Sequence, residues 1–147
     1  MRTPHEDLPS LLSQIYKRGL TLITPERFKT INLAVKDIYE KNTPGDIVEV
    51  GCWRGGMSIY LAHAFHDRTM WAFDSFEGFA EMTEFKYSPL GIVHERHHSG
   101  FTHVESVLHG KETVSLAADY EETKLQFADF GLNKENGVNI VKGWVGE

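Results

Sequence analysis

The sequence predicts an α/β fold in which a parallel sheet is connected by crossover helices. A β-branched run at residues 47–50 precedes a helical pattern and a second apolar run, "TMWAFD", so strand, helix and strand follow one another within roughly 30 residues. A later helical pattern precedes a third apolar run, "VNIVKGW". This alternation of strands and helices is typical of parallel sheets.

Composition indicates one globular domain. The chain has 147 residues, of which 41% are hydrophobic and 24% charged. Its net charge of −6 argues against nucleic acid as a partner, because phosphate binding needs clustered Lys and Arg. The single Cys52 excludes an intrachain disulfide and fits a reducing compartment. Since no signal-like or membrane-length apolar segment occurs, we expect a cytoplasmic protein without a membrane partner.

Residues 1–45, before the first strand, are expected to form two helices that cover the core. The first spans residues 8–18 and ends at Gly19, a plausible C-cap. The second spans residues 25–41, with Thr24 as N-cap and Pro25 as its first residue. Its apolar face consists of Phe28, Ile31, Val35 and Ile38.

The stretch "DIVEVGCWRGGMSIYLAHAF", residues 46–65, places a carboxylate in a strand that a parallel sheet would bury on both faces. Glu49 therefore needs a compensating partner, and the glycines after it allow a ligand to approach the backbone at the strand's carboxyl end. Glu49 could orient the ammonium group of an amino-acid-like ligand. Alternatively, Glu49 caps the following turn and the three glycines, Gly51, Gly55 and Gly56, serve packing only.

A second acid ends the second strand. Asp74 lies 23 residues after Gly51, where doubly wound folds often place an acid that binds ribose hydroxyls. The alternative is a turn begun by Asp74 with Ser75. The glycine pattern is G-x-x-x-G-G and not the G-x-G-x-x-G of dinucleotide binders, which disfavours a nicotinamide-dependent oxidoreductase. The two acids together favour an adenosine-containing ligand, and residues 46–75 form the first cofactor unit.

Residues 76–113 show no sustained period and are interpreted as an irregular insertion acting as a polar lid. They hold five of the eight histidines, and a metal site is the alternative interpretation. One of these histidines could face an acceptor. The five are His94, His97, His98, His103 and His109.

Residues 114–147 are expected to form a helix and the third strand. Ser115 is the predicted N-cap and Gly131 lies near the helix end. Leu116, Tyr120 and Phe127 would share one helical face. We interpret Phe127 and Phe130 as core residues, and Cys52 as a small buried hydrophobe, while Arg54 is left open between ligand contact and packing.

Four stretches, "PGDIVEVGCWRGGMSIYLAHAF", "WAFDSFEGF", "VSLAADYEETKLQFADFGL" and "VNIVKGWV", together resemble the macrocin O-methyltransferase family. Its members are S-adenosylmethionine-dependent enzymes that methylate sugar hydroxyls of natural products. The resemblance runs from about residue 25 to the end and is poor in the His-rich insertion. It implies a Rossmann-like class I methyltransferase fold, present as a single partial domain truncated after the third parallel strand.

The resemblance also implies which residues bind S-adenosylmethionine. The first cofactor loop of the family corresponds to Glu49, Gly51 and the "WRGG" motif, its ribose-binding strand end to "DS", and its adenine side to "GW". The implied cofactor residues are Glu49, Gly51, Trp53, Arg54, Gly55, Gly56, Asp74, Ser75, Gly143 and Trp144.

The family's magnesium ligands and catalytic base lie beyond position 147, so no catalytic or metal-binding residue is nominated, and this chain alone is expected to be inactive. The strand around Val48 and Val50 would form an open sheet edge. The expected partners are a small-molecule hydroxyl acceptor and either a missing C-terminal half or a second copy. The alternative function is a non-catalytic nucleotide-binding or assembly module that pairs through this edge.

Overall fold

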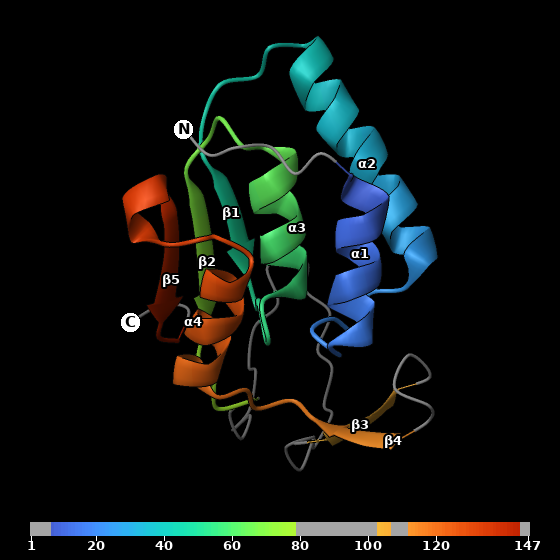
Figure 1. Ribbon diagram of the computed structural model, residues 1–147, viewed down its shortest axis with the longest axis vertical. Coiled ribbons are helices and arrows are strands. Elements are labelled where there is room, and N and C mark those ends of the chain that lie inside the picture. Colours follow the sequence, from blue (N-terminus) through green and yellow to red (C-terminus); the bar gives the residue numbers. More distant parts are fainter. Residues whose placement is uncertain (1–6, 79–102, 107–111, 145–147) are drawn as a thin grey trace, which may run out of the picture.

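The computed structural model describes residues 7–78, 103–106 and 112–144 (Figure 1). Three of the described strands form a parallel sheet in the order β1-β2-β5, which confirms the predicted sheet, and β3 pairs antiparallel with β4. The elements are α1 (Leu8–Lys17), α2 (Pro25–Glu40), β1 (Ile47–Val50), α3 (Gly56–Ala64), β2 (Met70–Asp74), β3 (His103–Ser106), β4 (Glu112–Ser115), α4 (Tyr120–Asp129), the 3-10 helix η2 (Lys134–Asn136) and β5 (Val138–Lys142).

One face of the parallel sheet is covered by helices. The α3 and α4 crossovers lie over this face, and α1 packs against α3 (Figure 1). The strand register aligns alternate residues in rows across the three strands, and Met70 and Ala72 on the covered face are fully buried. The rows facing these helices contain Ile47, Met70 and Val138, then Glu49, Ala72 and Ile140.

The opposite face of the sheet is uncovered in the described part of the chain. Val48 and Val50 on β1 are 58% and 61% exposed, and β1 is an outer strand of the sheet, as the predicted edge requires. Trp71 shares this face and its indole N–H donates to Asp46 at 2.9 Å. An apolar surface of Val48, Val50, Phe73 and Val141 thus remains beside an edge strand.

The predicted helix caps are correct for α2 and wrong for α4. Thr24 precedes α2 and Pro25 is its first residue, as expected. Ser115, however, belongs to β4, where it pairs with His103, and α4 begins only after Asp119. The Asp119 carboxylate accepts the Glu122 N–H at 2.7 Å and so caps α4. Because Ser115 is taken up in the strand pair, the helix starts several residues later than predicted.

The segment predicted to be irregular contains regular structure. Within residues 76–113, β3 and the beginning of β4 form an antiparallel pair, which corrects the interpretation of an entirely irregular insertion. In Figure 1 this pair lies at the end of the molecule to which the parallel strands point. His94, His97, His98 and His109 fall outside the described residues, so their predicted lid or metal role is untested. No described helix is long and apolar enough to cross a membrane.

Candidate cofactor site

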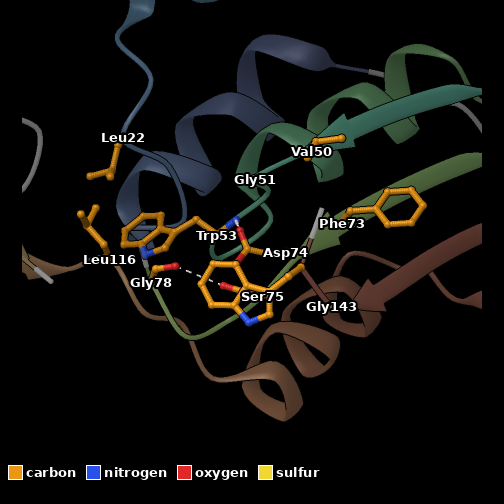
Figure 2. Close-up of a pocket in the computed structure, with 11 residues that line it drawn as sticks. Leu22, Val50, Gly51, Trp53, Phe73, Asp74, Ser75, Gly78, Leu116 and Gly143 are labelled. Atoms are coloured by element: carbon orange, nitrogen blue, oxygen red, sulfur yellow. Dashed lines mark hydrogen bonds between the residues drawn. The ribbon is translucent and has the colours of Figure 1, made fainter. Parts of the chain in front are cut away.

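A cavity of about 390 Å³ opens at the carboxyl ends of the three parallel strands (Figure 2). This end of an open α/β sheet is where ligands usually bind. Loops after all three strands contribute, together with the α1–α2 connection and the residue after β4. The lining residues are Leu22, Val50, Gly51, Trp53, Phe73, Asp74, Ser75, Gly78, Leu116, Gly143 and Trp144.

The loop after β1 is shaped by backbone conformations that glycine favours. Gly51 has a φ of 87°, and a Cβ built there would meet no atom within 4 Å, so its missing side chain leaves open space beside the cavity. The N–H groups of Gly51 and Cys52 both donate to the Phe73 carbonyl, at 2.8 and 3.1 Å. The loop is therefore held against the end of β2.

Asp74 connects this loop with the turn after β2. One carboxylate oxygen accepts the Trp53 N–H at 2.8 Å, and the other accepts the Phe76 N–H at 2.7 Å. Figure 2 shows Asp74 beside Trp53. Both donors are non-glycine residues in the left-handed region, with φ values of 51° and 61°. Such a conformation costs about 1–2 kcal/mol per residue, which charge-assisted hydrogen bonds can offset.

The remaining polar groups of the site come from the loops after β2 and β5. The Ser75 hydroxyl accepts the Glu77 N–H and donates to the Gly78 carbonyl, each at 3.2 Å. The Gly143 N–H donates to the Asp74 main-chain carbonyl at 3.0 Å. The structure therefore brings six of the ten predicted cofactor residues to one cavity: Gly51, Trp53, Asp74, Ser75, Gly143 and Trp144.

Glu49 turns away from the cavity and toward α3. Its carboxylate accepts a hydrogen bond from the fully buried Ser58 hydroxyl at the start of that helix. Burial raises the pKa of Glu49 from its ordinary 4.5 to about 7, with the Asp74 charge adding to the rise and the Ser58 hydrogen bond opposing it. The compensating partner of this strand acid is thus a helix hydroxyl, so Glu49 links β1 to α3.

Gly55 and Gly56 also serve packing. A Cβ on Gly55 would overlap the Phe127 ring of α4, and one on Gly56 would lie 2.5 Å from the Leu20 carbonyl oxygen. The Gly56 N–H donates to that carbonyl at 3.0 Å. These two glycines let α3 approach α4 and the end of α1, which agrees with the packing alternative for this part of the motif.

Arg54 lies in a separate, smaller cavity of about 220 Å³, whose lining includes Asp119 and Glu122. Its guanidinium stacks over the Trp53 ring at 4.5 Å and donates to the Gly19 carbonyl at 3.3 Å. Arg54 therefore packs on the ring of an indole that lines the main cavity.

In the part of the chain that the structure describes, the cavity has neither a reactive thiol nor a metal site beside it. Cys52 is buried, and burial together with the charges of Glu49 and Asp74 raises the pKa of its thiol, which favours the predicted role as a small buried hydrophobe. Among residues 7–78, 103–106 and 112–144, no group of three His, Cys, Asp or Glu side chains could hold a metal ion. The described residues thus do not fit the magnesium that the family resemblance implies.

Five lining residues escaped the sequence analysis. Val50 is the last residue of β1 and Phe73 the penultimate residue of β2, so the strand ends alone could have indicated both. Gly78 has a φ of 83° in the turn after β2. Leu22 and Leu116 come from segments far apart in the chain, and Leu116 precedes α4, so its predicted place on that helix's face is wrong. The missed residues supply much of the apolar wall.

Comparison with known proteins places the chain among O-methyltransferases. The profile of the Macrocin-O-methyltransferase (TylF) family matches residues 2–147. The chain is 34% identical over 129 residues to demethyldecarbamoylnovobiocin O-methyltransferase of Streptomyces niveus, covering 84% of this chain and 44% of that protein. Mycinamicin III 3''-O-methyltransferase of Micromonospora griseorubida is 28% identical over 129 residues, covering 84% and 46%.

A solved structure, that of the O-methyltransferase NovP, is also similar. It aligns with a TM-score of 0.58 and 30% identity over 85% of this chain and 48% of that chain, which confirms the Rossmann-like methyltransferase fold class. The chain spans less than half the length of each of these relatives. With a family profile matched over residues 2–147, the chain belongs to the Macrocin-O-methyltransferase (TylF) family.

Proposed function

We propose that the chain is the cofactor-binding portion of an S-adenosylmethionine-dependent O-methyltransferase that acts on a hydroxyl group of a small-molecule natural product. The observation that supports this most strongly is the position of the cavity. It is bounded by the loops after three adjacent parallel strands, in a chain that belongs to a methyltransferase family.

The cavity lining suits an adenosine-containing ligand. Two indoles, Trp53 and Trp144, offer flat apolar surface for an adenine ring, and the polar groups of Asp74 and Ser75 are of the type that binds ribose hydroxyls. In this proposal the six cavity residues form the wall of the site that surrounds the cofactor. The other four members of the predicted set, Glu49, Arg54, Gly55 and Gly56, support the site from behind through packing and hydrogen bonds.

Methyl transfer makes different demands on donor and acceptor. The methyl carbon forms a bond to the acceptor oxygen as its bond to sulfur breaks with the electron pair, and the hydroxyl proton passes to a base. The described residues can bind and orient the donor. Among the described residues, no group of side chains offers a fitting ligand set for magnesium.

The names of the relatives support the acceptor class. They specify O-methylation of demethyldecarbamoylnovobiocin, of mycinamicin III at a 3'' position and of a rhamnosyl-tetracenomycin of Streptomyces olivaceus at a 4' position. By extension, we propose a hydroxyl-bearing natural product as the acceptor of the protein to which this chain corresponds.

The test is calorimetric titration of the purified chain with S-adenosylmethionine and S-adenosylhomocysteine, with NAD as a matched adenosine-containing control. We expect both sulfur compounds to bind at one site and NAD to bind more weakly or not at all. A chain that is folded by circular dichroism and binds neither sulfur compound would refute the cofactor assignment.

A second candidate function is assembly through the open sheet edge. It is favoured by the exposure of Val48 and Val50 beside the outer strand β1. Light scattering would measure the mass of the unaltered chain and of Val48→Lys. A defined dimer that becomes monomeric in the variant supports assembly, whereas a monomer in both cases argues against it.

A further inference from the structure

The carboxylate of Asp74 does more than face a ligand. Building on the proposed function, we infer that Asp74 is a positioning residue whose carboxylate joins two loops of the cavity before any ligand binds. This role, and not contact with ribose hydroxyls, sets most of its contribution to affinity for an adenosine ligand. The reasoning rests on which groups its oxygens already accept.

Both carboxylate oxygens are engaged by the protein itself. The Trp53 N–H of the loop after β1 donates to one oxygen and the Phe76 N–H of the turn after β2 donates to the other, at 2.8 and 2.7 Å. Only a side chain with two acceptor oxygens can satisfy both donors. An asparagine has one acceptor oxygen and would direct its NH₂ group toward the second N–H.

The two donors lie at conformationally demanding positions. Of the three described non-glycine residues with positive φ, two are Trp53 and Phe76, and each presents its N–H to Asp74. The left-handed backbone at these residues needs surrounding interactions to persist. Asp74 supplies one such interaction to each of them, so it stabilises the shape of both loops together.

Each donor also places an aromatic ring. The Trp53 indole lines the cavity and is stacked by the Arg54 guanidinium, and the centroid of the buried Phe76 ring lies 5.1 Å from that of Tyr120 on α4. Fixing the backbone of Trp53 therefore fixes a wall of the cavity. Fixing Phe76 ties the same carboxylate to the packing of α4.

The main chain of Asp74 reaches the third loop. Its carbonyl accepts the Gly143 N–H at 3.0 Å, so one residue contacts the loops after β1, β2 and β5. All three loops line the cavity. The main-chain contact would survive a change of side chain, and a substitution therefore isolates the two carboxylate bonds.

The test compares two isosteric substitutions, Asp74→Asn and Asp119→Asn. Asp119 is a suitable control because the hydrogen bond that its side chain accepts from the Glu122 N–H needs only one acceptor oxygen, and asparagine is as good an N-cap as aspartate. Affinity is measured on each folded chain for S-adenosylhomocysteine and for its 2',3'-dideoxy analogue. We expect Asp74→Asn to lower the affinity for both ligands by the same factor, about tenfold or more, and Asp119→Asn to leave both affinities unchanged.

Ribose recognition predicts a different pattern. If Asp74 acts through the ribose hydroxyls, Asp74→Asn weakens S-adenosylhomocysteine but leaves the affinity for the dideoxy analogue unchanged, and this result would overturn the inference. A thermodynamic cycle that combines the Asp74→Asn change in the protein with removal of the ribose hydroxyls from the ligand separates the two cases.

Amide hydrogen exchange of the ligand-free chain tests the positioning role of Asp74 independently of ligand binding. We expect the Trp53 and Phe76 amides to be protected in the unaltered chain and in Asp119→Asn, and to lose protection in Asp74→Asn. Failure of Asp74→Asn alone to fold would support the positioning role, because a ribose contact contributes nothing to the ligand-free chain. Equal exchange of both amides in all three proteins would contradict it. If no adenosine ligand binds the unaltered chain, the proposed function fails while this exchange result still decides the role of Asp74.

Discussion

The stretch from β1 into α3 contains two regions built from the same residue types that serve different ends. In the region around Gly51 and Trp53, the backbone faces the cavity and an absent side chain leaves space. In the region around Gly55 and Gly56, the absent side chains let helices approach one another. The comparison teaches that a glycine-rich loop beside a ligand site divides its glycines between ligand access and packing.

The two acids on the strands beside these regions, Glu49 on β1 and Asp74 at the end of β2, differ in the same way. Glu49 points to α3 and is held by the Ser58 hydroxyl, whereas Asp74 points to the cavity loops and is held by two backbone N–H groups. Burial of Glu49 raises its pKa to about 7. A strand acid in this fold therefore contributes to packing or to the site according to which hydrogen-bond donors the fold brings to its carboxylate.

The largest expected effect comes from the packing region. Gly56→Ala places a Cβ 2.5 Å from the Leu20 carbonyl oxygen, where only backbone movement relieves the clash. We expect the free energy of unfolding to fall by about 3 kcal/mol, while the folded fraction keeps its ligand affinity. Urea denaturation and titration measure the two quantities.

Gly143→Ala is the matched control for that change. A Cβ at Gly143 meets no atom within 4 Å, so the free energy of unfolding should change by less than about 0.5 kcal/mol. Equal destabilisation by both alanines would break the distinction between the packing glycines and those at the cavity.

The next effect is a pH dependence of stability that originates at Glu49. Its pKa is about 7 in the folded chain against an ordinary 4.5, so between these values the folded chain keeps a proton that the unfolded chain has lost. Its contribution to stability is therefore fully present below about pH 4.5, declines as pH rises to 7 and stays low above 7. The decline amounts to about 2 kcal/mol, less than the full conversion of the pKa difference because the residue is only half-buried.

Glu49→Gln tests this dependence, because glutamine stays neutral and still accepts the Ser58 hydrogen bond. We expect the decline between pH 4.5 and 7 to disappear and the variant to be more stable than the unaltered chain at pH 8. Denaturation at several pH values measures it, with Glu135→Gln on the exposed η2 turn as control. An unchanged pH profile in Glu49→Gln would show that another group is responsible.

A smaller effect on stability is expected from Gly51 in the cavity region. Gly51→Ala keeps open space around its Cβ but forces alanine to a φ of 87°. We expect a loss of about 1 kcal/mol in the free energy of unfolding, with a larger relative loss in affinity for S-adenosylhomocysteine, because the added methyl group stands beside the cavity. An undiminished affinity would place the ligand elsewhere.

Local patterns predicted most of the parallel sheet and the helices around it. The β-branched run at 47–50, the Thr24–Pro25 start and Gly131 after α4 all act within a few residues of the elements they mark. The Ser115 cap failed because a suitable capping residue can equally join a strand, and pairing with β3 decided the outcome. The partner residue, His103, lies too far from Ser115 in the sequence for a local helix pattern to include it.

The candidate site was predicted only in part, for a similar reason. Strand ends and glycines indicated where a ligand would approach, and six predicted residues meet at the cavity. The contacts of the two acidic side chains could not be predicted, because Glu49 and Asp74 differ only in which neighbours the fold brings to them. Leu22 and Leu116 are ordinary apolar residues until the chain places them together.

Mapping of backbone amide shifts by NMR during titration with S-adenosylhomocysteine tests the central claim most directly. The claim is that the ligand contacts the cavity region and leaves the packing region behind it. We expect the largest shifts at Gly51, Trp53, Ser75 and Gly143, with small shifts at Gly55, Gly56 and Ser58. Shifts concentrated on those last three amides, or no shift in a folded chain, would contradict the account.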